Sequence, residues 1–288
     1  MTYMHEHLRV DLSTEKGDID CLLDEFDKIR DEMQVLAAKG LKRVVDMSCR
    51  GMGRDYEYLD RMEKETGINI VISTGFYKDP FLPAVVQASD IQTLSALMID
   101  DIERGAEGNN RKARIIGEIG TSQNRMTENE EKVFRAAALA HEKTGVPVST
   151  HTTLGTMGME QLALLTSLGV KPERIILGHL DLADDEELII KALDTGAYVE
   201  FDTIGKIKYL SDEKRIAFIK TACERGYVKQ LLLSMDITRR SHLKVNGVIG
   251  YAYLFDNFLP RLKEAGVVEE AIQDMLSNNP DEIFKEVP

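Results

Sequence analysis

The chain has 288 residues, of which 43% are hydrophobic and 30% charged, and its net charge is -13. This acidic balance argues against a nucleic-acid partner, because binding to phosphate backbones rests on clustered lysine and arginine. No apolar run approaches the roughly 20 residues of a membrane span, so we expect no membrane partner. The three cysteines, Cys21, Cys49 and Cys223, lie far apart, which favours a reducing compartment and a cytoplasmic location.

Short runs rich in valine and isoleucine alternate with longer segments of 3.6-residue periodicity, a pattern typical of repeated βα units. In chain order, the predicted strands are 3–7, 43–47, 69–74, 114–118, 146–150, 174–178, 197–201 and 231–235. The predicted helices are 19–38, 55–66, 91–104, 128–144, 159–168, 185–194, 212–225 and 251–264, with a short final helix at 268–277. No linker divides the chain. The pattern therefore predicts an α/β protein, a single-domain (β/α)8 TIM barrel over residues 1–288.

Side chains that commonly bind metals stand at the ends of five predicted strands. His5 and His7 close the first strand, where extended backbone points both imidazoles to the same side. The others follow later strands: Glu118, His151, His179 and Asp236. Because the carboxyl ends of barrel strands meet at one rim, we expect these six residues to bind two divalent metals. Histidine-rich ligation favours Zn²⁺ and is compatible with Mn²⁺, Co²⁺ or Ni²⁺.

Each of these side chains also has a simpler interpretation. His5 and His7 could be core histidines without a metal, Glu118 could pair with an arginine, and Asp236 could cap the next helix. An unpaired buried polar group costs on the order of 1 to 3 kcal/mol, and a shared cation removes that cost for the whole set. His141 lies inside a predicted helix, so we expect it to be an ordinary histidine on the helix surface.

Positive side chains gather after the last two predicted strands. Lys206 and Lys208 follow the seventh strand, and Arg239, Arg240 and His242 follow the eighth. Ordinary surface charge is one interpretation. On an acidic protein, beside a metal centre, the same groups indicate a clamp for an anionic small-molecule substrate.

With these residues assembled, the chain resembles the phosphotriesterase family of the amidohydrolase superfamily over nearly its whole length. The resemblance is carried by segments 5–8, 53–55, 74–77, 117–120, 149–152, 178–179 and 234–236. It implies a (β/α)8 barrel with two metals, His5, His7 and Asp236 on the more buried one and His151 and His179 on the other. Many members bridge the metals with a carbamylated lysine where this chain has Glu118, so whether Glu118 bridges both metals stays open.

The resemblance also implies a reaction, in which a metal-bound hydroxide attacks an ester and Asp236 acts as ligand and base. The family's sugar-phosphate lactonases hold the substrate phosphate with a lysine and an arginine that match Lys206 and Arg239, whereas His242 stands where they tend to have tyrosine. Tyr77 matches a family tyrosine near the metals, with a loop-packing aromatic as the alternative. The expected substrate is a lactone or other small ester, including a phosphorylated sugar lactone.

Two other functions compete with this hypothesis. One is a phosphotriesterase of low activity, which Lys206 and Arg239 disfavour because a triester is neutral. The other is a non-catalytic metal-binding barrel that senses a ligand or partners a protein. The sequence leaves the oligomeric state open, and a homodimer is compatible with it.

Overall fold

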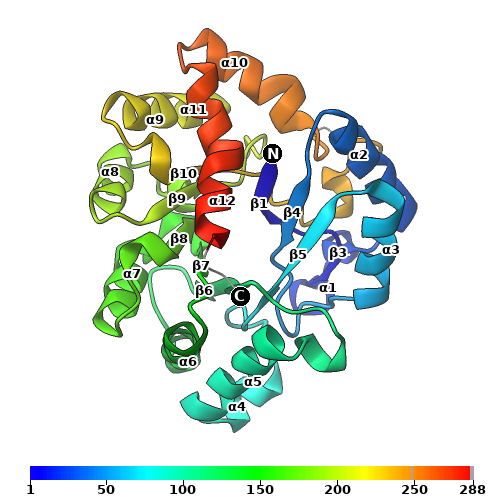
Figure 1. Cartoon of the computed structure of the whole chain (residues 1–288), viewed down its shortest axis with the longest axis vertical. Helices are drawn as coiled ribbons and strands as arrows, with labels where there is room; N and C mark the ends of the chain where they lie inside the picture. Colours follow the sequence, from blue (N-terminus) through cyan, green and yellow to red (C-terminus); the bar gives the residue numbers. More distant parts are fainter. Residues whose placement is uncertain (248, 286–288) are drawn as a thin grey trace.

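The computed structural model describes residues 1–247 and 249–285. Its centre is an eight-stranded parallel sheet that curls into a nearly closed barrel with helices around the outside (Figure 1). The strands follow one another in chain order: β1 Thr2–Glu6, β4 Arg43–Asp46, β5 Asn69–Thr74, β6 Ile115–Thr121, β7 Val148–Thr152, β8 Ile175–Gly178, β9 Tyr198–Phe201 and β10 Leu231–Leu233. The prediction of a (β/α)8 barrel is confirmed.

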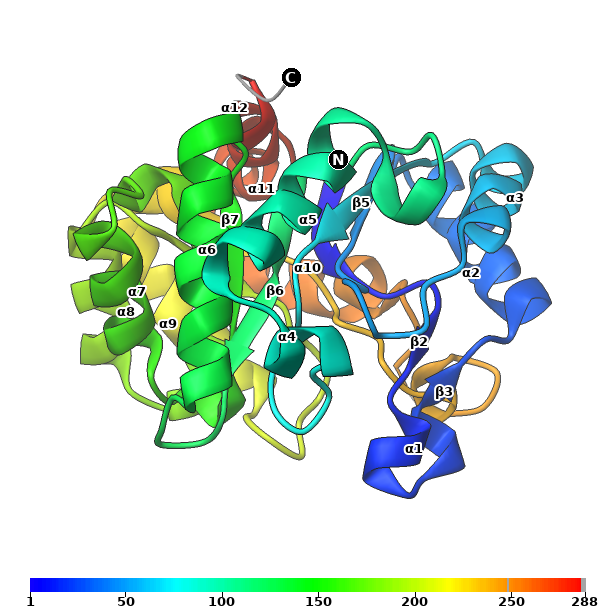
Figure 2. The same ribbon diagram turned by 90° about the horizontal axis from the view of Figure 1, so that it is seen from below.

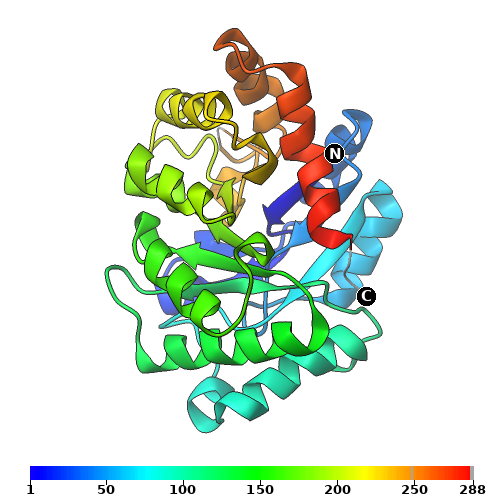
Figure 3. The same ribbon diagram turned by 60° about the vertical axis from the view of Figure 1, so that its left-hand side comes forward.

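The helices cover the sheet from outside and bury their apolar faces against it. They are α2 Phe26–Ala38, α3 Tyr56–Thr66, α4 Ala84–Ala88, α5 Ile91–Glu103, α6 Glu128–Thr144, α7 Gly158–Ser167, α8 Glu186–Asp194, α9 Asp212–Glu224 and α10 Leu259–Glu264. α5 packs beside α6, which lies along β6 (Figure 3). Gly67 and Gly145 end α3 and α6 at φ 71° and 74°, a left-handed conformation that glycine adopts without strain. Among the residues described, no helix combines the length and apolar character needed to cross a bilayer.

The first predicted helix, 19–38, is wrong in its first third. Residues Ile19–Cys21 form a 3-10 turn, in which the Asp18 carboxylate accepts a hydrogen bond from the Asp20 N–H at 3.1 Å. A short strand, β3 Leu22–Leu23, follows this turn, and α2 begins only at Phe26. The local aspartate cap and the burial of the strand outweigh the helical periodicity of this segment.

A hairpin of β3 with the antiparallel β2, Val10–Asp11, projects from one end of the barrel. The short helix α1, Ser13–Lys16, lies within it. Figure 2 shows this hairpin at the end of the barrel opposite the N-terminus and α12. It therefore flanks the rim where the strands have their carboxyl ends.

The described chain ends in a run of short helical segments that packs on the barrel exterior. They are α10, α11 Glu269–Gln273 and α12 Asn279–Phe284, with π-helical turns at Leu254–Phe258 and Asp274–Asn278. Pro260 and Pro280 lie in the first turns of α10 and α12, and because proline lacks an N–H, the turn before each one takes a wider hydrogen-bonding pattern. The Asn279 amide donates to the Val228 carbonyl, in the turn before β10, and to the Leu231 carbonyl at the start of β10, which attaches α12 to the barrel.

Candidate metal centre

The structure brings the six predicted ligands together at the carboxyl-end rim of the barrel: His5, His7, Glu118, His151, His179 and Asp236. Two of them sit differently from the sequence expectation. β6 continues past Glu118 to Thr121, and β7 continues past His151 to Thr152, so both side chains lie inside strands. The register between β6 and β7 shifts before Ile119, next to Glu118. Strands of the sheet therefore carry His5, Glu118 and His151, whereas His7, His179 and Asp236 lie just past the ends of their strands.

Glu118 is the centre of this cluster. Its Oε2 lies 3.4 Å from His5 Nε2, 3.0 Å from His151 Nδ1 and 3.4 Å from His179 Nε2, and its Oε1 lies 3.3 Å from His7 Nε2. Among the described residues, three groups of potential ligands have all their ligand atoms within 4.8 Å of one another, and two of these groups contain Glu118. One is His5, His7 and Glu118, and the other is Glu118, His151 and His179. Both groups share Glu118, the arrangement that a carboxylate between two cations requires.

The hydrogen bonds around His7 leave its Nε2 facing two carboxylate oxygens. The Ser48 hydroxyl donates to the Arg9 carbonyl at 2.9 Å, so His7 Nδ1 must donate to Ser48 Oγ, also at 2.9 Å. In the neutral ring, Nε2 then carries a buried lone pair that faces Glu118 Oε1 at 3.3 Å and Asp236 Oδ1 at 3.4 Å. Such a contact is repulsive unless a proton or a metal ion lies between the atoms.

The pKa of His7 reflects the two carboxylates that face its Nε2. Burial alone would lower it, but hydrogen bonds with the Asp236 and Glu118 carboxylates outweigh burial and raise the pKa to about 10. Burial opposes ionisation of Glu118 too, yet the surrounding imidazoles hold the pKa of that carboxyl well below its ordinary value. An anionic carboxylate among imidazoles is a donor set suited to zinc and similar divalent metals, so the residues present fit a metal centre.

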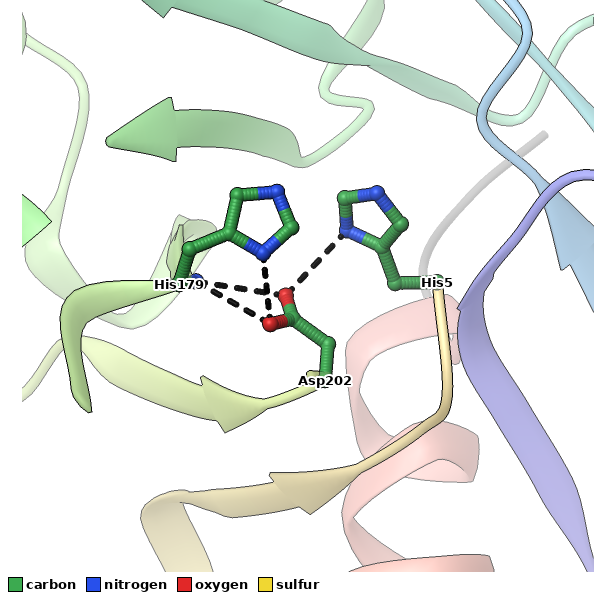
Figure 4. A group of neighbouring side chains, drawn as sticks. All are labelled: His5, His179 and Asp202. Carbon is green, nitrogen blue, oxygen red and sulfur yellow. Dashed lines mark hydrogen bonds and ion pairs between the residues drawn. The ribbon is translucent and has the colours of Figure 1, made fainter. Parts of the chain in front are cut away.

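Asp202, which sequence reasoning missed, orients two of the imidazoles. Its Oδ1 lies 2.6 Å from His179 Nδ1, and its Oδ2 lies 3.3 Å from His5 Nδ1 (Figure 4). With each Nδ1 turned towards this carboxylate, His5 and His179 direct Nε2 towards Glu118. The available signal was an acidic residue directly after the predicted strand 197–201, similar to Asp236 after its own strand.

Asp236 is held from two sides. The Lys206 ammonium donates to its Oδ2. Behind it, the buried Glu6 carboxylate accepts from the N–H groups of Met235 and Ile237, at 2.8 and 3.1 Å. Burial by itself would raise the pKa of Asp236, but Lys206 and the neighbouring imidazoles outweigh it and hold the pKa well below its usual range. Asp236 is thus a pre-oriented anion.

A cavity of about 230 Å³ opens beside the cluster, and all four predicted substrate-binding residues line it: Tyr77, Lys206, Arg239 and His242. The Tyr77 hydroxyl lies 3.3 Å from either ring nitrogen of His151. Burial, reinforced by the Glu118 carboxylate, keeps the pKa of Tyr77 well above its ordinary value, so its hydroxyl stays a hydrogen-bond donor. Apolar side chains complete the walls: Leu12, Phe81, Leu154 and Leu182.

Arg239 and His242, which the sequence suggested as part of a cationic clamp for the substrate, differ from that expectation in charge and pairing. Arg239 is already paired through Nη1 with Asp18 at 2.8 Å and Asp20 at 3.4 Å, both from the hairpin segment. His242 is neutral, because burial and the nearby Lys206 ammonium lower its pKa to about 3. It therefore offers a hydrogen bond instead of a positive charge. His141 is also accounted for without a metal, since its Nδ1 lies 2.7 Å from the Val146 carbonyl.

Comparison with known proteins identifies the family. The model of the phosphotriesterase family matches residues 1–284. The chain is 49% identical to the phosphotriesterase homology protein of Escherichia coli (strain K12) over 284 residues, 99% of this chain and 97% of the relative. It is 32% identical to an aryldialkylphosphatase of Saccharolobus solfataricus, over 98% of this chain and 94% of the relative.

Solved structures agree with this assignment. The crystal structure of the E. coli protein, complexed with phosphate in its active site, superposes with a TM-score of 0.96 over 98% of each chain. A lactonase from Listeria monocytogenes, 31% identical, superposes with a TM-score of 0.93 over 98% of this chain and 94% of the lactonase. From the matched length, the shared barrel and the ligand cluster at its rim, this chain belongs to the phosphotriesterase family.

Proposed function

We propose that this protein is a metal-dependent hydrolase of small cyclic esters, with phosphorylated sugar lactones as the preferred substrate class. One observation carries the proposal: imidazole nitrogens and two carboxylates converge, with lone pairs facing one another, at the floor of a cavity that cationic side chains also line. The similarity to a lactonase supports the choice of ester.

The ligands of the proposed centre are His5, His7, Glu118, His151, His179 and Asp236, with Glu118 between the two sites. Divalent cations bound there, Zn²⁺ by preference, would lower the pKa of a water molecule towards neutrality and polarise the carbonyl of the ester. Asp202 keeps His5 and His179 in the ligand tautomer. The apolar walls limit access of bulk water to the reacting ester.

In this proposal Asp236 is the proton carrier. Oδ1 faces His7 at 3.4 Å, while Lys206 occupies Oδ2 and fixes the carboxylate plane. Asp236 accepts the proton of the attacking water and delivers it to the leaving oxygen when the lactone ring opens. Tyr77 donates a hydrogen bond to the bound ester, while Arg239 and His242 contact the substrate on the side of the anionic group.

The test compares metal-loaded wild type with Asp236→Asn on sugar lactones. We expect the variant to retain bound zinc, measured by elemental analysis, and to lose turnover by about a hundredfold or more, because its amide cannot accept the proton. Asp60→Asn, an exposed position on α3, is the control and should be fully active. Wild-type rates from Asp236→Asn would contradict the role of Asp236 as the proton carrier.

The similarity to an aryldialkylphosphatase makes triester hydrolysis a second candidate. Turnover measurements distinguish the lactonase from the triesterase. They compare lactones with and without phosphate and a neutral triester as substrates of wild type and of Arg239→Ala. A preference for the triester that Arg239→Ala leaves unchanged would favour this second function. Metal-loaded protein that is inert towards every lactone, ester and triester would instead favour a non-catalytic role.

A further inference from the structure

The cations that line the cavity are not equally neutralised. Lys206 is paired with Asp236, and Arg239 is paired with two aspartates of the hairpin segment. Lys16 and Lys78 also line the cavity, and within residues 1–247 and 249–285 neither has a carboxylate at ion-pair distance. The uncompensated positive charge of the cavity mouth is therefore that of Lys16 and Lys78.

These two lysines come from distant parts of the chain and meet around one aromatic ring. Lys16 ends α1 in the hairpin segment, and Lys78 follows β5. The Lys16 ammonium lies 5.7 Å and the Lys78 ammonium 5.5 Å from the centre of the Phe81 ring. Lys78 Nζ donates to the Asp79 carbonyl at 3.2 Å, a neutral partner that leaves its charge uncompensated.

The two lysines differ in exposure, because Lys78 is half-buried whereas Lys16 is exposed to solvent. Burial, and to a lesser degree the nearby Lys16 ammonium, lowers the pKa of Lys78, although Glu130 and other acidic groups oppose this. The aromatic ring attracts both cations but brings like charges together. An oxyanion between the two ammonium groups would relieve that repulsion.

The lysine pair also lies close enough to the proposed metal ligands for one small substrate to reach both. The Tyr77 ring lies 4.8 Å from the ring of His151 and 5.4 Å from that of Phe81. A single aromatic side chain therefore separates the proposed metal ligands from the lysine pair. A small ligand could place its ester at His151 and an anionic group at Phe81.

We propose that Lys16 and Lys78 form an anion subsite that binds the phosphate monoester of the substrate across the Phe81 ring. Two ammonium groups match the charge of a phosphate dianion, and lysine binds phosphate as a point charge. The subsite rests on the proposed function in one respect: the same substrate molecule is taken to place its ester at the metal centre. It makes Lys16 and Lys78 determinants of specificity that the resemblance to sugar-phosphate lactonases did not indicate.

The binding test uses ribose 5-phosphate and ribose as probes on zinc-reconstituted protein, measured by titration calorimetry. For Lys16→Met/Lys78→Met we expect about tenfold weaker binding of ribose 5-phosphate, with ribose unaffected. The control, Lys42→Met/Lys64→Met, removes two exposed lysines outside the cavity and should bind as wild type does. We call Lys16→Met/Lys78→Met the cavity variant. Added salt should weaken the binding of ribose 5-phosphate to wild type more than its binding to the cavity variant. Equal affinity of the cavity variant and wild type would overturn the subsite.

Turnover separates this proposal from the proposed function. With phosphorylated lactones, the cavity variant should raise KM about tenfold and change kcat little, because the lysines contact a group remote from the reacting bond. If wild type hydrolyses no lactone but the cavity variant still loses affinity for ribose 5-phosphate, the proposed function fails and the subsite stands. If KM is unchanged while Arg239→Ala alone raises it, the anion is bound at Arg239 and the subsite is wrong.

Discussion

A single carboxylate, that of Asp202, fixes the ring orientation of two imidazoles in the candidate centre. It lies 2.6 Å from His179 Nδ1 and 3.3 Å from His5 Nδ1, at a fully buried position. Carboxylates behind metal-bound histidines hold the tautomer and raise the basicity of the ligand nitrogen. We therefore expect loss of the Asp202 carboxylate to lower metal affinity directly and to affect catalysis only through the metal.

For Asp202→Asn we expect zinc affinity to fall about 10- to 100-fold, because the amide places a neutral group with a single oxygen where the carboxylate faces both Nδ1 atoms. Competition with a chromophoric chelator measures the dissociation constant directly. Glu187→Gln, at an exposed position, removes an equal charge far from the imidazoles and should leave affinity unchanged. Unaltered zinc binding by Asp202→Asn would show that the two rings are oriented without it.

At the scale of elements, the barrel closes between its first and last strands largely through side chains, with one backbone hydrogen bond from the Asp236 N–H to the His5 carbonyl at 3.3 Å. In the described part of the chain, the ladder of parallel pairs runs from β1 to β10 without joining the two ends. Ser234 Oγ instead accepts from the N–H groups of Met4 and His5, at 2.8 and 2.9 Å, and donates to Glu200 at 2.9 Å. Together with the Glu6 carboxylate, which accepts from Met235 and Ile237, this hydroxyl connects β1 to the segment that follows β10.

Ser234→Ala should lower the free energy of unfolding by about 2 kcal/mol or more, since two buried N–H groups lose their acceptor. Urea denaturation of metal-free protein measures the effect. Ser73→Ala is a matched control, because Ser73 is equally buried at the end of β5 and its hydroxyl has no hydrogen-bond partner among the described residues. Equal losses for the two variants would mean that Ser234 contributes nothing specific to closure.

At the scale of the whole molecule, the proposed ligands come from both ends of the sheet and from its middle. His5 and His7 belong to β1 and its end, Glu118 to β6, and Asp236 follows β10. Metal bound at these residues would connect elements that are distant along the chain. Metal binding and barrel stability should therefore be coupled.

Removing metal with a chelator should lower the unfolding temperature, and zinc should restore it. Free zinc at a hundred times its dissociation constant stabilises the folded state by about 2.7 kcal/mol per site through mass action. Glu118→Gln should abolish most of the zinc-dependent shift in a thermal scan, whereas Glu57→Gln, at an exposed position on α3, should keep it. A shift of the same size in Glu118→Gln would place the stabilising metal elsewhere.

The sequence alone determined the features that depend on local pattern. Alternating apolar runs and periodic segments place eight strands, and ligand-type side chains at five strand ends indicate which residues should meet. This works because all parallel strands of a barrel bring their carboxyl ends to one rim. The first third of the predicted helix 19–38 was wrong because its pairing partner, β2, is not visible in local periodicity.

Only the tertiary structure decided how the assembled residues interact. The pairing of Arg239 with Asp18, the contact of Lys206 with Asp236, and the position of Asp202 behind His5 all join residues far apart in the chain. Charge compensation and tautomer depend on distances of a few ångströms in a buried site, where the dielectric is low and each contact weighs heavily. Sequence therefore gave the identity of the candidate ligands, and the fold decided which of their atoms face one another and which cations stay uncompensated.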